Sequence, residues 1–149
     1  MADHGLGGLP STPDPRDWDT PLDTAAPLPA RYLLTGIPAA YNQGNSPRCG
    51  GYSGAGLKGV HARADGHGFL PFDGDWLYNR AQQYDGIPLP HIGTTARGVA
   101  KALQKEGCQV RGKWGSAPLY RIASYSAVPF TYDAIKRAIH TYKIGRAHV

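Results

Sequence analysis

The chain has 149 residues, a formal net charge of +5, 20 glycines, 13 prolines and two cysteines. This length allows one domain with a buried core and excludes two large ones, and no apolar run approaches the roughly 18 residues that a transmembrane helix needs. The N-terminus lacks a signal-peptide pattern, so the localisation stays open, with a lean toward a reducing, cytoplasmic compartment if both cysteines stay unpaired.

Basic residues gather in the last third of the chain. Residues 101–149 contain nine Lys and Arg against two acidic residues, Glu106 and Asp133. The basic side chains are spread singly and do not alternate with aromatic residues, as a surface that stacks on bases would require. We interpret them as a solvated surface and expect neither a nucleic-acid nor a membrane partner.

Residues 1–40 are predicted to form an extended N-terminal segment. A proline recurs every few residues, as in LPSTPDPRDWDTPLDTAAPLP, and each proline fixes its φ angle and lacks a backbone N–H donor. A disordered leader is the alternative interpretation of the same composition.

The stretch YNQGNSPRCGGYSGA, residues 41–55, places turn-forming residues directly before a cysteine. We predict that Cys49 is the first residue of a helix and that Gln43 folds back beside it. The positive end of a helix dipole favours a thiolate, which makes Cys49 a candidate nucleophile. The Cys49 backbone N–H and the Gln43 side-chain amide would then converge as an oxyanion hole.

Two other interpretations of this stretch exist. A lone cysteine is more often a small buried hydrophobic residue than a nucleophile. The sequence GAGLKG, residues 54–59, matches the G-x-G-x-x-G fingerprint of dinucleotide-binding proteins, but that fingerprint follows a strand, and turn-forming residues precede it here. The sequence therefore indicates no dinucleotide, and it indicates no other cofactor.

The helix that begins at Cys49 is predicted over residues 49–64. Each of its five glycines after Cys49 costs up to ~1 kcal/mol relative to alanine, so we expect this helix to be the most buried one. His61 and His67 have no partner at the spacing of metal ligands, and we interpret both as surface residues in a chain without a metal site. The expected inner face consists of Tyr52, Ala55, Gly56, Val60 and Ala64.

Three further helices are predicted at 74–84, 95–105 and 132–142. Each has candidate N-cap residues at or next to its first residue. These are Asp73 for the first helix, Thr94 or Thr95 for the second, and Thr131 or Asp133 for the third.

The connections between these helices contain other expected features. Gly107 should end the helix at 95–105, and Cys108 should lie in the core. Residues 122–128 alternate moderately between apolar and polar and are a candidate strand. His91 lies in a turn-rich loop, GIPLPHIG, where we expect it to be exposed.

The residues around Cys49 resemble those of the papain-like cysteine peptidases. That family carries Q-G-x-x-G-S-C-W-A-F-S at this place, with the same six-residue step from Gln to Cys. The chain keeps Gln43, Gly44, Cys49 and Ser53. It lacks the family's neighbouring disulfide-forming cysteine, and its departures look like the bacterial and phage-type branch. These departures are Pro47, Arg48, Gly50, Gly51 and Tyr52.

Other stretches resemble the same family in order, over nearly all of residues 6–142. They are PDPRDW with LPARY, DGDWLYNRAQQYDG, and GTTARGVAKALQKEGC. The resemblance implies an α+β papain-like fold, present mainly as its helical half, with Trp18 and Tyr32 anchoring the N-terminal segment. It also implies that Gly93 and Thr94 lie near the peptide-binding edge. In these terms the chain divides into the N-terminal segment 1–40, the helical half 41–128 and the start of the β half 129–142.

The second half of a catalytic site is missing from the sequence. The family places its basic histidine about 130–150 residues after the cysteine, and only 100 residues follow Cys49. His140 and His148 come too early and lack the family's context. The last seven residues, KIGRAHV at 143–149, equal the translation of a common sequencing-adapter read. We therefore predict that the natural sequence ends near Tyr142, with a genuine polar C-terminus as the alternative.

The resemblance implies that the parent protein is a cysteine-type peptidase acting on peptide or protein substrates, present here as an incomplete and inactive fragment. Cys49 would attack the peptide carbonyl while Gln43 helps to hold the oxyanion. Two alternatives remain: a papain-fold protein used only for binding, and a cysteine acyltransferase or amidase of related geometry. Substrate preference and oligomeric state are not indicated.

Overall fold

The computed structural model describes residues 7–15, 20–33, 35, 37, 39–115 and 117–142. Trp18, the predicted anchor, lies outside these residues, and so does the predicted adapter-derived tail at 143–149, which contains His148. Of the helices in the described part, none is long and apolar enough to cross a membrane.

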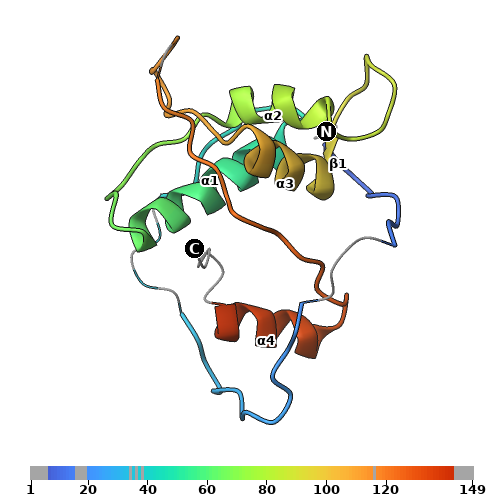
Figure 1. Ribbon diagram of the computed structural model, residues 1–149, viewed down its shortest axis with the longest axis vertical. Coiled ribbons are helices and arrows are strands. Elements are labelled where there is room, and N and C mark those ends of the chain that lie inside the picture. Colours follow the sequence, from blue (N-terminus) through green and yellow to red (C-terminus); the bar gives the residue numbers. More distant parts are fainter. Residues whose placement is uncertain are drawn as a thin grey trace.

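The described residues are mainly helical, with one small sheet. The elements in chain order are β1 (Gly8–Leu9), α1 (Cys49–Ala64), α2 (Gly74–Gln82), β2 (Thr94–Thr95), α3 (Ala96–Lys105) and α4 (Tyr132–Tyr142). The two strands pair in parallel, Gly8 opposite Thr94 and Leu9 opposite Thr95. Helices α1, α2 and α3 pack together at one end of the molecule, and α4 lies apart at the other end (Figure 1).

Helix α1 begins and ends where the sequence predicts, and glycine determines how it packs. A Cβ atom at Gly51 would collide with the Gly74 carbonyl and lie 2.6 Å from Cβ of Tyr78, and one at Gly54 would lie 2.5 Å from Val99 Cγ1. The helix therefore approaches α2 and α3 more closely than side chains would allow.

The predicted inner face of α1 is wrong except for Ala55. Tyr52, Gly56 and Val60 are only half-buried, and Ala64 is exposed. The physical reason is that α2 and α3 lie against the glycine-rich stripe rather than against the aromatic and branched residues. The buried residues of α1 are Gly51, Gly54, Ala55, Lys58, Gly59 and Ala62.

Helix α1 is also not the most buried helix. Six of its 16 residues are buried, compared with four of nine in α2 and four of ten in α3. One face of α1 packs on the other two helices, and the opposite face lines a cavity together with residues of the segment before Cys49.

The predicted caps position α2 and α3. The Asp73 carboxylate accepts hydrogen bonds from the backbone N–H groups of Asp75 (3.1 Å) and Trp76 (3.0 Å). Thr95 caps α3 by accepting from Gly98 N–H at 2.8 Å, so that helix begins at residue 96 rather than 95. Helix α2 ends at Gln82, two residues before the predicted end.

A compact apolar core lies between α1, α2 and α3. Cys108 is fully buried in it, as predicted, and exchanges backbone hydrogen bonds with Tyr120 at 3.0 Å. Gly107, with φ of +97°, ends the turn after α3. The core residues are Ala55, Ala62, Phe72, Leu77, Ala81, Val99, Ala102, Leu103 and Cys108.

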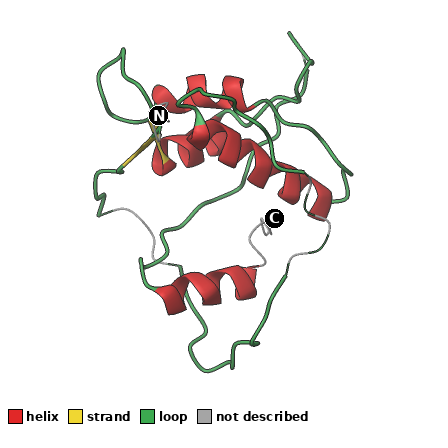
Figure 2. Cartoon of the chain, turned by 180° about the vertical axis from the view of Figure 1, so that it is seen from behind, coloured by secondary structure: helices red, strands yellow, loops and turns green. Residues whose placement is uncertain are grey.

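The candidate strand at 122–128 is not formed. This segment is irregular and crosses from the packed helices α1, α2 and α3, called here the α1–α3 body, to α4, as Figure 2 shows from behind. Its backbone bonds to two other parts of the chain: Ile122 donates its N–H to the Leu103 carbonyl at 3.2 Å, and Thr20 donates to the Ala127 carbonyl at 2.8 Å from its N–H and at 2.7 Å from its hydroxyl. In the described part of this segment, Ala127 is the one residue in a β-bridge, and a single bridge does not make a ladder.

Helix α4 is tied to the N-terminal segment. Thr131 caps it by accepting from Ala134 N–H at 3.2 Å. Arg137 donates to the carbonyls of Asp23 and Ala26, both at 2.9 Å. Tyr32, one of the two predicted anchors, packs edge-on against His140 with ring centroids 5.2 Å apart.

Candidate active site

The candidate nucleophile lies at the start of α1. Cys49 is the first helical residue and is half-buried. Arg48 occupies the N-cap position, and its side chain makes no cap hydrogen bond. Cys49 and Cys108 are both thiols rather than a disulfide. The G-x-G-x-x-G match at 54–59 lies inside α1, and residues 41–48 before the helix form turns and no strand. The match therefore lacks the strand that precedes a dinucleotide-binding fingerprint.

Gln43 lies in a closed turn in front of the helix. Its side-chain Nε2 donates to the Ser46 carbonyl at 2.8 Å, and the Ser46 hydroxyl donates back to the Gln43 carbonyl at 2.8 Å. Gly44, with φ of +62°, allows this turn. The bond to Ser46 takes only one of the two N–H bonds that a glutamine amide carries.

A cavity of about 430 Å³ adjoins this turn on the open face of α1. Gln43 lines it on one side and the α1 residues Tyr52 and Leu57 on the other. The lining is mostly apolar, which suits an apolar side chain better than a charged one.

An ion pair that the sequence did not reveal ties the nucleophile turn to α2. Arg48 Nη1 lies 2.8 Å from Asp75 Oδ1, and the Tyr52 hydroxyl donates to Asp75 Oδ2 at 3.2 Å. The hydrogen bond to Asp75 raises the pKa of Arg48 above its ordinary value. Both ionic side chains are partly exposed, so the pair orients the turn more than it stabilises the fold.

The backbone N–H groups of the predicted peptide-binding residues, Gly93 and Thr94, have different hydrogen-bond partners. Gly93 donates its N–H to the Tyr78 hydroxyl at 2.9 Å, and its carbonyl accepts from Gln82 Nε2 at 3.2 Å. Thr94 instead donates its N–H to the Gly7 carbonyl at 2.9 Å, within the β1–β2 pair. Thr94, not Gly93, thus provides the backbone donor that pairs with an extended chain.

Thr94 also lies against the nucleophile helix. Its Cγ2 methyl would be 2.5 Å from a Cβ atom at Gly50, the residue after Cys49. Gly7 approaches the same place from the other side, because a Cβ there would collide with the Pro47 carbonyl. The structure therefore brings Thr94 and the start of α1 together, with residues 7–9 beside both.

A buried carboxylate supports this edge, and no sequence pattern indicated it. Asp85 Oδ1 accepts from the Thr94 hydroxyl (2.9 Å), the Thr95 N–H (2.9 Å) and the Thr95 hydroxyl (2.7 Å). Asp85 Oδ2 lies 3.1 Å from His91 Nε2. The Asp85 side chain is 0% exposed and that of His91 10% exposed.

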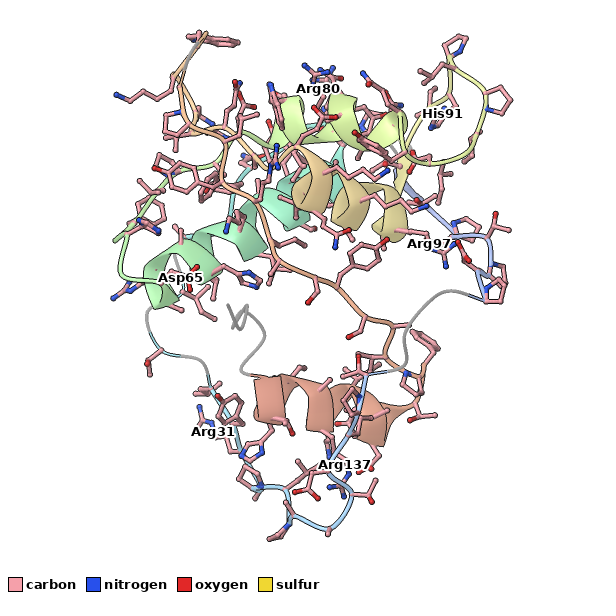
Figure 3. The ribbon with its side chains drawn as sticks, in the orientation of Figure 1. Arg31, Asp65, Arg80, His91, Arg97 and Arg137 are labelled. Atoms are coloured by element: carbon pink, nitrogen blue, oxygen red, sulfur yellow. The ribbon has the colours of Figure 1, made fainter. Side chains whose placement is uncertain are left out.

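The expectation that His91 is exposed is therefore wrong. Its ring lies in the loop after α2, labelled in Figure 3, and Asp85 holds it against the body. His91 Nδ1 is buried and has no hydrogen-bond partner among the described residues. The loop composition indicated exposure, but a carboxylate six residues earlier in the chain reverses it.

His61 also departs from the expected surface position. It is half-buried, and its Nδ1 is buried without a hydrogen-bond partner in the described part of the chain. His67 is exposed, as predicted. Burial, followed by the nearby charge of Lys58, lowers the pKa of His61. Among the described residues, no group of three or more His, Cys, Asp or Glu side chains could hold a metal ion.

The fold, but not the sequence, finds a counterpart among known proteins. No protein-family model and no curated protein matches the chain. A crystal structure of xylellain, a cysteine protease from Xylella fastidiosa, matches with a TM-score of 0.80 at 20% sequence identity. The match covers 92% of this chain and 63% of that chain, so the chain spans less than two thirds of xylellain's length. The papain-like fold that the sequence resemblance implied is thus confirmed as a fold.

Proposed function

We propose that this chain is the nucleophile-bearing part of a cysteine-type peptidase. The observation that carries the proposal is the thiol of Cys49 at the first residue of α1, in a chain that shares the fold of a cysteine protease. A helix N-terminus is one of the positions at which reactive cysteines of proteins are found.

In the proposed reaction, the Cys49 thiolate attacks the carbonyl carbon of a peptide bond. The Cys49 N–H and the Gln43 amide hold the oxyanion, the amine leaves, and a thioester forms that water then hydrolyses. The leaving amine needs a proton donor, which we assign to a histidine of the parent protein outside residues 1–149. The 149-residue chain alone should therefore show no useful turnover.

The peptide is proposed to lie along Thr94, where the structure already holds an extended chain. The Gly7 carbonyl accepts the Thr94 N–H, so this edge is able to pair with a main chain. A bound peptide that used the same donor would compete with residues 7–9.

The nucleophile is tested by covalent labelling of the 149-residue chain, which needs no turnover. A tripeptide vinyl sulfone adds to an activated thiol to form a thioether, and intact mass reports the adduct. We expect labelling to disappear in Cys49→Ala and to persist in the matched variant Cys108→Ala. Cys108 is fully buried, and burial raises its pKa to about 12, so its thiolate is scarce at neutral pH.

Two results would contradict the proposed nucleophile. One is labelling that persists in Cys49→Ala. The other is a tripeptide reagent that labels no faster than ethyl vinyl sulfone, which carries no peptide and reports bare thiol reactivity.

A binding protein with this fold is the second candidate, and the β1–β2 pair favours it. Pairing through the Thr94 N–H requires no thiol, so peptide affinity would survive in Cys49→Ala. The two functions separate in the parent protein, where a peptidase shows Cys49-dependent hydrolysis and a binding protein does not. An acyltransferase or amidase would use the same residues and would be recognised by its product.

A further inference from the structure

One carboxylate lies where three elements of the body meet. Asp85 follows the end of α2, and its Oδ1 reaches both residues of β2, the second of which is also the N-cap of α3. Burying a carboxylate is costly unless its oxygens are hydrogen-bonded. The Asp85 carboxylate takes part in four hydrogen bonds, with Thr94, Thr95 and His91, which offset the cost of burying its charge.

The first turn of α3 leaves room for the Asp85 carboxylate. A Cβ at Gly98 would collide with Asp85 Oδ1, so the first turn of α3 is open at the point where the carboxylate enters. The Thr95 hydroxyl gives its proton to Asp85 and accepts the Gly98 N–H, which satisfies both of its roles.

Asp85 also determines which way Thr94 faces. The Thr94 hydroxyl donates to Asp85, and as a consequence its Cγ2 methyl lies against Gly50, next to Cys49. A threonine Cβ carries both groups, so fixing one fixes the other. The carboxylate thereby sets the spacing between the peptide-pairing N–H of Thr94 and the nucleophile helix.

His91 holds the carboxylate from its other oxygen. Its Nε2 bonds to Asp85 Oδ2, while its own backbone carbonyl accepts from Gln82 Nε2 at 2.7 Å. Gln82 also donates to the Gly93 carbonyl and to the Tyr78 hydroxyl. Residues 91–93, at the end of the loop that begins at Asp85, are therefore tied back to α2.

We propose that Asp85, oriented by His91, is the positioning residue for the peptide-binding edge at Thr94. It acts through Thr94 and Thr95 and touches neither the peptide nor the thiol. This inference rests on the proposed function. It separates two properties of the site: the fit of a peptide, which needs Asp85, and the reactivity of Cys49, which does not.

The test uses the 149-residue chain and the isosteric variant Asp85→Asn, with Asp133→Asn as a matched control for loss of one negative charge in an exposed i, i+4 ion pair of α4. Three quantities are measured: the half-saturating concentration of the tripeptide vinyl sulfone, its maximal labelling rate, and the rate of Cys49 alkylation by iodoacetamide. Amide hydrogen exchange at residues 93–95 is followed in parallel. All variants are repeated in a Gly7→Val background and compared with Gly7→Val alone, because a side chain at residue 7 collides with the Pro47 carbonyl and should displace residues 7–9 from Thr94.

In Asp85→Asn we expect the half-saturating concentration to rise at least about tenfold, the scale of one lost hydrogen bond to a charged group. The maximal rate and the iodoacetamide rate should stay within about twofold, and amide protection should fall at Thr94 and Thr95 but not in α1. His91→Leu should also raise the half-saturating concentration of the tripeptide vinyl sulfone. His91→Gln keeps a side-chain N–H donor, so its half-saturating concentration should lie between those of His91→Leu and wild type.

Three outcomes would overturn the inference. The first is an unchanged half-saturating concentration in both Asp85→Asn and His91→Leu. The second is a parallel loss of both labelling rates with protection lost throughout α1, which indicates a merely structural residue. The third is unchanged protection at Thr94 and Thr95. Failure of the proposed function looks different, because the wild-type chain would then show no peptide-dependent labelling while the exchange experiment still tests the role of Asp85.

Discussion

The two ends of the molecule are held together in different ways. The α1–α3 body is stabilised by a buried apolar core and by glycine-mediated contact between helices. Among its described hydrophobic residues, the α4 end buries only Ala134 and Ala138 and leaves Phe130 98% exposed. Hydrogen bonds from Arg137 tie it to the carbonyls of Asp23 and Ala26. Because burial of apolar area is the main source of stability, the candidate site lies in the part of the chain that we expect to be most stable.

The largest expected loss of stability comes from creating a cavity in the core of the α1–α3 body. Leu77 is fully buried in the body, and Leu77→Ala should lower the free energy of unfolding by about 2–5 kcal/mol. Ile135 of α4 is 38% exposed, and Ile135→Ala should cost less than about 1 kcal/mol. Urea denaturation followed by circular dichroism measures both. Equal losses would show that α4 is as firmly packed as the body.

A smaller effect should distinguish the two faces of α1. A Cβ at Gly51 collides with α2, so Gly51→Ala should destabilise the chain by roughly 1–3 kcal/mol. At Gly56 no atom lies within 4 Å of the added Cβ, so Gly56→Ala should stabilise it by up to about 1 kcal/mol. The same denaturation experiment applies. A stabilising Gly51→Ala would mean that α1 and α2 are further apart than described.

The smallest effect concerns the pH dependence of the body. Burial lowers the pKa of His61, so the unfolded chain binds a proton more readily than the folded one. Stability from this residue is therefore present above the unfolded pKa of about 6.5 and falls as the pH drops below it. Comparing urea midpoints at pH 7.5 and pH 5.5 should show a smaller acid-induced decrease in His61→Gln than in wild type. An equal decrease would place the responsible group elsewhere.

Local signals were sufficient for the starts of α1, α2 and α3. Cys49, Asp73 and Thr95 each stand next to turn-forming or capping residues, and each marks a helix start in the structure. Capping is decided by a few neighbouring residues, which is why the sequence predicts it. The end of α2 was missed by two residues, since Tyr84 continues the apolar spacing although the chain has already turned.

The nucleophile turn was predicted in part. Cys49 at a helix start and the six-residue step to Gln43 are both sequence features, and the structure places the cysteine as expected. The hydrogen bond from Gln43 to Ser46 and the ion pair between Arg48 and Asp75 are not visible in the sequence. The first depends on how one turn closes, and the second joins residues 27 positions apart.

The sequence by itself determined the helix starts, the position of the thiol and the resemblance that led to the fold, because these depend on neighbouring residues and on a motif of fixed spacing. Only the tertiary structure decided which face of α1 is buried, that residues 7–9 pair with Thr94, and that Asp85 gathers Thr94, Thr95 and His91. The reason is that glycine carries no hydrophobic pattern, so the buried stripe of α1 becomes apparent only when α2 and α3 lie against it. A buried carboxylate is likewise recognised by the hydrogen-bond donors around it. The partners of Asp85 lie six to ten residues later in the chain, and folding brings them together.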